Sequence, residues 1–295
     1  MHRVAILGVI GLIAFGLAVH ASYCLWRRKP LPWPSRVGLG LTLTGVVCFF
    51  YALFIEADWL QVTHLTVQTA KWKKGKTLRI AHFSDLHVDR ESRALDRLGQ
   101  ELAKAKPDLI VFTGDSINEA GALKLFRTTI GGFPSRLGRL AVRGNHDTYR
   151  WGALDLFSGV AVELTHGPVV FDDGAISVCG AAFNKFDALP DCIAGAPKGA
   201  FTVVAFHTPD LVEDLDPKPD LYLAGHTHGG QVALPFYGAL VTFSRFDKKY
   251  ESGTFQVGPT TLNVNRGIGF EPHLPRVRFF SRPELTLIDV EGTAD

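Results

Sequence analysis

The sequence predicts an α/β domain that follows two membrane-spanning helices. From about residue 59 onward, short apolar or β-branched runs alternate with amphipathic stretches, as strands and helices do in α/β proteins. Residues 1–58 instead contain two long apolar stretches that are separated by a basic linker. We therefore expect a transmembrane hairpin over residues 1–58 and one soluble domain over residues 59–295.

The two apolar stretches are long enough to cross a bilayer. Residues 4–26 carry His20 as their only basic or acidic side chain, and residues 37–55 carry none. Because a helix needs about 20 apolar residues to cross the hydrocarbon core, we predict spans at about residues 4–26 and 37–56. A signal peptide cleaved near residues 19–21 is the alternative for the first stretch.

The basic linker bears on orientation. Its cations are Arg27, Arg28, Lys29 and Arg36. By the positive-inside rule they would lie in the cytoplasm, which places the soluble domain outside a bacterial cytoplasmic (inner) membrane as part of a multi-pass protein. Lysines soon after the second span, at positions 71, 73, 74 and 76, favour the opposite orientation.

Composition limits the classes of partner and the redox chemistry. The net charge is +2 and 20% of the residues are charged, so no global field favours nucleic acid. The four cysteines are Cys24, Cys48, Cys179 and Cys192. We expect four free thiols, with a Cys179–Cys192 disulfide as the open alternative.

Polar side chains follow the predicted strands of the soluble domain directly. The strand-like runs 78–83, 109–112, 140–142, 203–206 and 221–224 are followed by Asp85 and His87, Asp115, Asn145, His207, and His226 and His228. Between the first two runs, residues 90–106 have helical spacing and end at Pro107. Ligands gather at the carboxyl ends of such strands, so we expect these side chains to meet. Beyond residue 230 the pattern is one of strands and turns.

Carboxylate, imidazole and amide groups are ligands that hard or borderline divalent metals accept. Asp85, His87, Asp115 and His228 would hold one ion, and Asp115, Asn145, His207 and His226 the other. Two ions, with Mn favoured over Fe or Zn, would activate a bridging water or hydroxide and clamp an in-line displacement at phosphorus.

Other polar residues have less definite roles. His146 would stabilise the transition state or protonate the leaving oxygen, and Asp147 would orient its ring. Arg266 and Arg143 are candidates for binding substrate phosphate, although solvated loop charges are the alternative for them and for Arg245, Arg276 and Arg278. We expect ordinary core or surface roles for the other histidines, which are His2, His20, His64, His82, His166 and His273.

These motifs resemble the calcineurin-like metallophosphoesterase superfamily over residues from about 78 to 290. Residues 207–210, 225–231, 265–269 and 282–285 resemble its membrane-anchored bacterial phosphodiesterase branch more narrowly. The resemblance implies a four-layer α/β sandwich of two mixed β-sheets flanked by helices. That branch includes pyrophosphatases that act on UDP-2,3-diacylglucosamine in lipid A biosynthesis.

The resemblance implies a membrane-anchored phosphodiesterase or pyrophosphatase that acts on a phosphate ester or a nucleotide-lipid and contacts the bilayer. An extracytoplasmic phosphodiesterase for wall or phospholipid-derived diesters is the alternative, because UDP-2,3-diacylglucosamine belongs to the cytoplasmic face. A non-catalytic membrane scaffold is the distant alternative.

Overall fold

The computed structural model describes residues 16, 19–24, 26–165, 167–272 and 275–295. The chain divides into two compact units, Met1–Phe54 and Ile55–Asp295. Of the histidines expected to have ordinary roles, His2, His166 and His273 lie outside the described residues.

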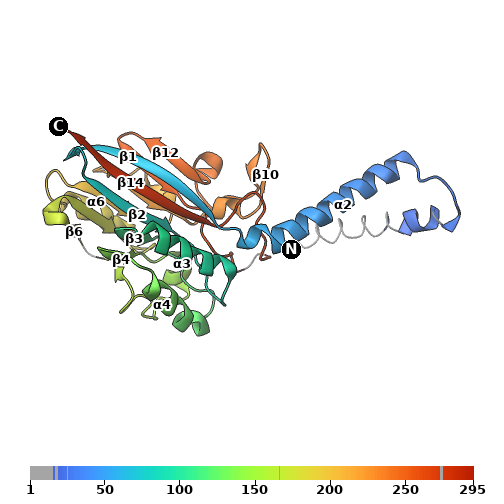
Figure 1. Cartoon of the computed structure of the whole chain (residues 1–295), viewed down its shortest axis with the longest axis horizontal. Helices are drawn as coiled ribbons and strands as arrows, with labels where there is room; N and C mark the ends of the chain where they lie inside the picture. Colours follow the sequence, from blue (N-terminus) through green and yellow to red (C-terminus); the bar gives the residue numbers. More distant parts are fainter. Residues whose placement is uncertain (1–15, 17–18, 25, 166, 273–274) are drawn as a thin grey trace. The chain divides into compact units, whose positions relative to one another are not determined.

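The first unit contains the helix α2 (Trp33–Phe54; Figure 1). Its apolar side chains are largely exposed. A helix that is apolar on all sides suits a lipid environment. Among the described residues, Trp33–Asp58 is the one helical run long and apolar enough to cross a membrane, and a signal sequence can meet the same criteria. The predicted span at residues 4–26 lies largely outside the described residues, so the hairpin stays a prediction.

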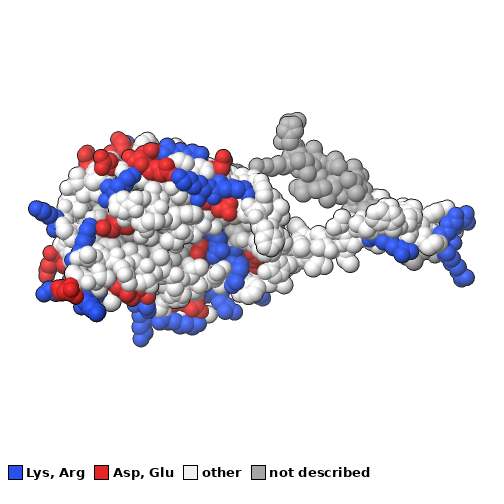
Figure 2. All heavy atoms as spheres, turned by 90° about the horizontal axis from the view of Figure 1, so that it is seen from above, with Lys and Arg blue, Asp and Glu red and all other residues white. Residues whose placement is uncertain are grey.

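The linker of the first unit is basic and exposed. Figure 2 shows Lys and Arg gathered at one end of this unit, with little charge along the rest of its visible surface. The cations of that segment in the sequence are Arg27, Arg28, Lys29 and Arg36, and all four are exposed.

The second unit contains two mixed six-stranded sheets. The first has the order β1 (Gln61–Lys73), β14 (Glu284–Ala294), β2 (Thr77–Phe83), β3 (Leu109–Phe112), β4 (Gly138–Ala141) and β5 (Val162–Glu163). The second has the order β12 (Gly253–Val257), β13 (Thr260–Val264), β9 (Leu221–Ala224), β8 (Phe201–Ala205), β7 (Ile176–Gly180) and β6 (Val169–Phe171). A two-stranded hairpin is formed by β10 (Ala233–Leu234) and β11 (Gly238–Ala239).

Both sheets are parallel at their centres. Strands β2, β3, β4 and β5 run parallel in the first sheet, and β7, β8, β9 and β13 in the second. Antiparallel pairs lie nearer the edges, between β14 and β2, β12 and β13, and β6 and β7. The central strands are buried on both faces, which explains their unbroken apolar sequences.

Three apolar cores separate four layers of secondary structure. The helices α3 (Arg93–Ala105) and α4 (Leu123–Gly132) pack on the outer face of the first sheet. The inner faces of the two sheets pack against each other. The helix α6 (Leu189–Ala194) covers the outer face of the second sheet. The predicted arrangement of two mixed sheets flanked by helices is therefore confirmed (Figure 1).

A disulfide joins α6 to the second sheet. Cys179 at the end of β7 and Cys192 in α6 are bonded, with Cα atoms 5.8 Å apart. The expectation of four free thiols is therefore wrong for this pair, because the third core brings both side chains together. Cys24 and Cys48 are free.

Candidate metal centre

Five of the six acidic and imidazole residues at the strand ends have a left-handed backbone, His207 being the exception. Asp85 and His87 follow β2 with φ of 50° and 43°, and Asp115 follows β3 with φ of 59°. His226 and His228, after β9, have φ of 72° and 52°. Such conformations are uncommon outside glycine and cluster at functional sites, where the surrounding structure holds them.

Glycines beside these residues let separate loops approach closely. A Cβ on Gly144 would lie 2.1 Å from Asp115 Oδ1, and a Cβ on Gly225 would lie 1.9 Å from Ser84 Oγ. Both distances are shorter than any Cβ contact can be. The glycine before Asn145 and the glycine before His226 are therefore required by packing.

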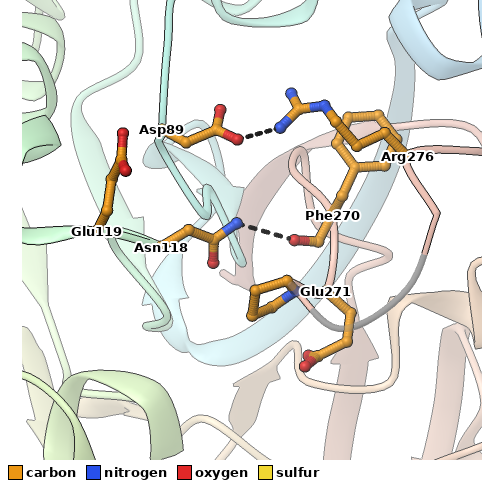
Figure 3. Close-up of a pocket in the computed structure, with 7 residues that line it drawn as sticks. Asp89, Asn118, Glu119, Phe270, Glu271 and Arg276 are labelled. Carbon is orange, nitrogen blue, oxygen red and sulfur yellow. Dashed lines mark hydrogen bonds and ion pairs between the residues drawn. The ribbon is translucent and has the colours of Figure 1, made fainter.

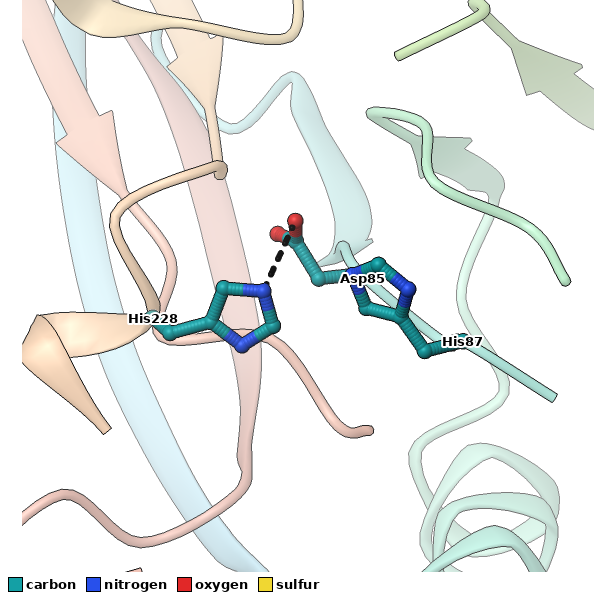
Figure 4. Close-up of side chains that lie close together, drawn as sticks. All are labelled: Asp85, His87 and His228. Atoms are coloured by element: carbon teal, nitrogen blue, oxygen red, sulfur yellow. Dashed lines mark ion pairs between the residues drawn. The ribbon is translucent and has the colours of Figure 1, made fainter. Parts of the chain in front are cut away.

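The first cluster contains Asp85, His87 and His228, all buried (Figure 4). Asp85 Oδ1 lies 3.4 Å from His228 Nε2. Asp85 Oδ1 and His87 Nε2 have no hydrogen-bond partner in the described part of the chain. Buried polar atoms without partners are costly, and a divalent cation would satisfy both of them.

The second cluster contains Asp85, Asp115 and His207. His207 Nε2 lies 3.3 Å from Asp115 Oδ2 and 4.0 Å from Asp85 Oδ1. Asn145 Oδ1 lies 2.9 Å from the same nitrogen, and His226 Nδ1 lies 3.1 Å from it. The donor atoms of this cluster thus converge on one point, as cation ligands do.

The structure brings all seven predicted ligands together. We expected Asp115 to be shared by the two ions, and it does lie between His87 Nε2 at 3.6 Å and His207 Nε2 at 3.3 Å. Asp85 also belongs to both clusters. The donor set of carboxylate, imidazole and amide therefore fits two divalent ions, and the division of ligands between them stays a prediction.

Hydrogen bonds behind the ligands fix the orientation of the rings. His207 Nδ1 lies 2.7 Å from the Thr113 carbonyl oxygen, and His87 Nδ1 lies 2.8 Å from Asn118 Oδ1. In both rings Nε2 is therefore left to face the centre. Such outer partners orient metal-binding histidines, and the sequence offered no signal for Asn118.

Electrostatics favour a cation at this point. Burial lowers the pKa of His207, but Asp115 and Asp85 outweigh burial and raise it to about 9. Burial raises the pKa of Asp115, but His207 and His87 outweigh burial and lower it. The metal-free centre thus holds a proton on His207 between two carboxylates, where a metal cation would replace it.

His146 is paired with a residue that the sequence did not indicate. Its Nε2 lies 3.4 Å from Glu271 Oε1. Burial lowers the pKa of His146, but the hydrogen bond to Glu271 and the charges of Asp115 and Glu271 outweigh burial and raise it. No motif in the sequence marked Glu271.

Asp147 has a different contact from the one we expected. Its carboxylate accepts hydrogen bonds from the amides of Asp115, Ser116 and Gly144. It therefore ties the loop after β3 to the loop after β4, and Glu271 provides the carboxylate beside the His146 ring. A catalytic role for Asp147 stays a prediction.

A cavity of about 220 Å³ adjoins the centre (Figure 3). Its lining includes Asn118, which holds His87, and Glu271, which pairs with His146. Asp89 and Glu119 add two carboxylates, and Arg276 is paired with Asp89. The excess of negative charge suits a hydroxyl-rich or cationic group better than a second phosphate.

The predicted phosphate-binding arginines have carboxylate partners. Arg266 Nε lies 3.0 Å from Glu284 Oε2, and Arg143 Nε lies 2.7 Å from Glu163 Oε1. Binding of a substrate phosphate would require each guanidinium to leave its partner, so this role stays a prediction. Arg278 is fully buried and donates to the Gly269, Arg266 and Ser281 carbonyls, as a structural residue does.

The fold and the paired Asp/His clusters define a metal-dependent hydrolase. Residues 78–230 match the family model described as calcineurin-like phosphoesterase. The chain is also 31% identical, over 85% of its length, to 92% of the metallophosphoesterase YkuE of Bacillus subtilis (strain 168). The chain therefore belongs to the calcineurin-like phosphoesterase family, and the predicted resemblance is confirmed.

Two further relatives have named activities. The UDP-2,3-diacylglucosamine pyrophosphatase LpxG of Chlamydia muridarum (strain MoPn / Nigg) is 24% identical over 85% of this chain and 97% of its own length. The phosphodiesterase YaeI of Escherichia coli (strain K12) is 26% identical over 82% of this chain and 92% of its own length.

Proposed function

We propose that this chain is a membrane-anchored, two-metal phosphohydrolase that cleaves a phosphodiester or pyrophosphate bond. One observation carries the proposal: two buried Asp/His clusters share Asp85, and donor atoms in them lack hydrogen-bond partners. When bound there, two divalent ions, with Mn favoured, would polarise the phosphoryl oxygens and activate a water for in-line attack.

The residues of the chain supply the remaining steps. Asp147 accepts hydrogen bonds from backbone amides of the loops that carry Asp115 and Asn145, so it holds both ligands in place. Glu271 keeps the His146 ring oriented and favours its charged form. A charged His146 would donate a proton to the oxygen of the departing group.

A lipid-linked nucleotide is the first candidate substrate. The support is the similarity to LpxG, named a UDP-2,3-diacylglucosamine pyrophosphatase, together with the candidate span at Trp33–Asp58. The acidic cavity beside the centre suits the hydroxyls of a sugar or ribose. Such a substrate would place the catalytic domain in the cytoplasm.

An extracytoplasmic diester is the second candidate, and the disulfide favours it. Disulfides persist in oxidising compartments and are rare in the cytosol. The Cys179–Cys192 bond and the basic linker both support a domain outside the cytoplasmic membrane. Wall polymers or phospholipid-derived diesters would then be the substrates.

Detergent-purified, Mn-loaded full-length protein incubated with UDP-2,3-diacylglucosamine distinguishes the candidates. Release of UMP that is lost in Asp115→Ala would establish the nucleotide-lipid pyrophosphatase. Hydrolysis of a simple aryl phosphodiester without UMP release would retain the two-metal mechanism and select the extracytoplasmic diesters. If His228→Ala retained both UMP release and aryl phosphodiester hydrolysis, the two-metal proposal would be contradicted.

A further inference from the structure

A run of exposed apolar side chains lies beside the metal centre. Its members are on the β10–β11 hairpin, on the segment that follows it and on the loop before β14. We call the following six residues the apolar rim: Leu234, Phe236, Tyr237, Leu240, Phe243 and Phe280. Phe236 is fully exposed, and Tyr237 and Phe280 are 61% and 57% exposed. Water-exposed aromatic side chains at this density mark an interaction surface.

The hairpin and the loop that carry the rim lie side by side because their backbones are hydrogen-bonded together. Val232 forms a parallel bridge with Phe279, and the Ala233 amide donates to the Phe279 carbonyl at 2.8 Å. The following residue, Phe280, has a left-handed backbone with φ of 53°. Its ring packs edge-on against the ring of Phe279, with centroids 4.9 Å apart.

The rim lies next to metal ligands through Phe243 and through Ser281, the residue after Phe280. The Phe243 carbonyl oxygen lies 3.2 Å from His226 Nε2, and the two rings pack with centroids 6.2 Å apart. Ser281 Oγ donates to the His228 carbonyl at 2.6 Å. A surface that binds to the rim would therefore lie beside the metal centre.

The same loop is bonded to the end of the candidate membrane span. That span runs from Trp33 to Asp58, and its last residues, Glu56–Asp58, already belong to the second unit. The Ser281 amide donates to Glu56 Oε1 at 2.8 Å. A single residue, Ser281, thus connects the span's end to the metal ligand His228. The guanidinium of Arg282 also stacks on Trp59, 4.0 Å from its ring.

Cations lie beside the rim. Arg282 follows Phe280 by two residues, whereas Arg278 is fully buried and Arg245 and Arg276 are paired with Asp214 and Asp89. Lys248 lies over the Tyr237 ring at 3.1 Å from its centroid. Exposed aromatic side chains beside cations are typical of proteins that sit in the interfacial layer of a bilayer.

From these contacts we propose that the apolar rim inserts into the interfacial layer of the membrane that the chain spans. Insertion would present the metal centre to a phosphoester carried by a membrane lipid. The proposal rests on the proposed function, since it names the surface that brings that centre to its substrate. A second protein on the rim is the competing occupant, and the continuity with the span's end favours the bilayer.

The test uses the full-length protein in nanodiscs that contain nitroxide-labelled phosphatidylcholine. Cys24 and Cys48 are replaced by Ala, and an environment-sensitive fluorophore is attached to Phe236→Cys. Val170→Cys is the matched control, because Val170 is exposed and Figure 1 shows β6 and β10 at opposite ends of the second unit. We expect nitroxide quenching at position 236 and none at position 170. Equal absence of quenching at both positions would overturn the proposal.

Kinetics provide a second readout. Phe236→Ser with Tyr237→Ser should lower the ratio of lipid-diester to soluble aryl-diester turnover at least tenfold, which corresponds to about 1.4 kcal/mol or more, since both aromatic rings would lose their burial in the bilayer. An unchanged ratio would contradict insertion. Quenching does not depend on hydrolysis. Quenching of labelled Phe236→Cys, together with a wild-type protein that hydrolyses neither diester, would refute the proposed function and leave the docking surface supported.

Discussion

Metal binding should compete with a proton on His207, and the competition gives the affinity a definite pH dependence. In the metal-free protein the pKa of His207 is raised to about 9 because Asp115 and Asp85 outweigh burial. At pH 7 the group is two units below that value, so removing its proton costs about 3 kcal/mol at 1.36 kcal/mol per unit. The pKa of Asp85 is raised by burial, which acts in the same direction.

The direction of the pH dependence follows from the proton that the metal-free protein holds on His207. A cation replaces the proton on His207, so the affinity should rise with pH and level off above about pH 9. We expect the apparent dissociation constant for Mn²⁺ to fall about tenfold per pH unit, or about 100-fold between pH 6 and pH 8, for one proton released.

Competition against a chromophoric chelator measures that constant, and calorimetry in buffers of different ionisation enthalpy counts the protons. Asn cannot titrate, so His207→Asn should lose this proton release. A dissociation constant that stays flat between pH 6 and pH 8 in the wild-type protein would refute the reasoning.

Other substitutions test separate parts of the structure. Glu271→Gln should lower kcat about tenfold with little change in KM, and the loss should be larger for alkyl than for nitrophenyl leaving groups. Glu271→Asp should restore part of the lost activity, and equal effects on both leaving groups would exclude proton donation. Cys179→Ala with Cys192→Ala should cost about 3 kcal/mol of unfolding free energy for a loop of this length, and reductant should lower the Tm of the wild type alone. Gly225→Ala should abolish metal binding, because its Cβ would lie 2.3 Å from Asp85 Oδ2, whereas Gly121→Ala meets nothing within 4 Å and should bind normally.

Local patterns accounted for the architecture of the soluble domain. The apolar runs that end at Asp85, Asp115 and His207 correspond to β2, β3 and β8, because strands buried on both faces need unbroken apolar sequences. The helical spacing over residues 90–106 corresponds to α3. The ligand residues could be named because each follows such a strand.

Contacts between distant segments could not be predicted in this way. Glu271 lies far from His146 in sequence, and its role depends on the path of the loop before β14. The disulfide depends on α6 packing on β7, which a spacing of 13 residues does not determine. Asp147 was expected to face His146, but nearby backbone amides of two loops compete for its oxygens.

The two-metal centre depends most directly on Asp85, because this carboxylate belongs to both clusters. The most direct measurement compares metal content and aryl-phosphodiester turnover of metal-stripped, Mn-reconstituted wild type, Asp85→Asn and the exposed-site control Asp187→Asn. We expect about two ions per chain in the wild type and the control. Asp85→Asn should hold less metal, and its turnover should be about a thousandfold lower. Full turnover by Asp85→Asn, or turnover by wild type that holds no metal, would contradict the two-metal centre.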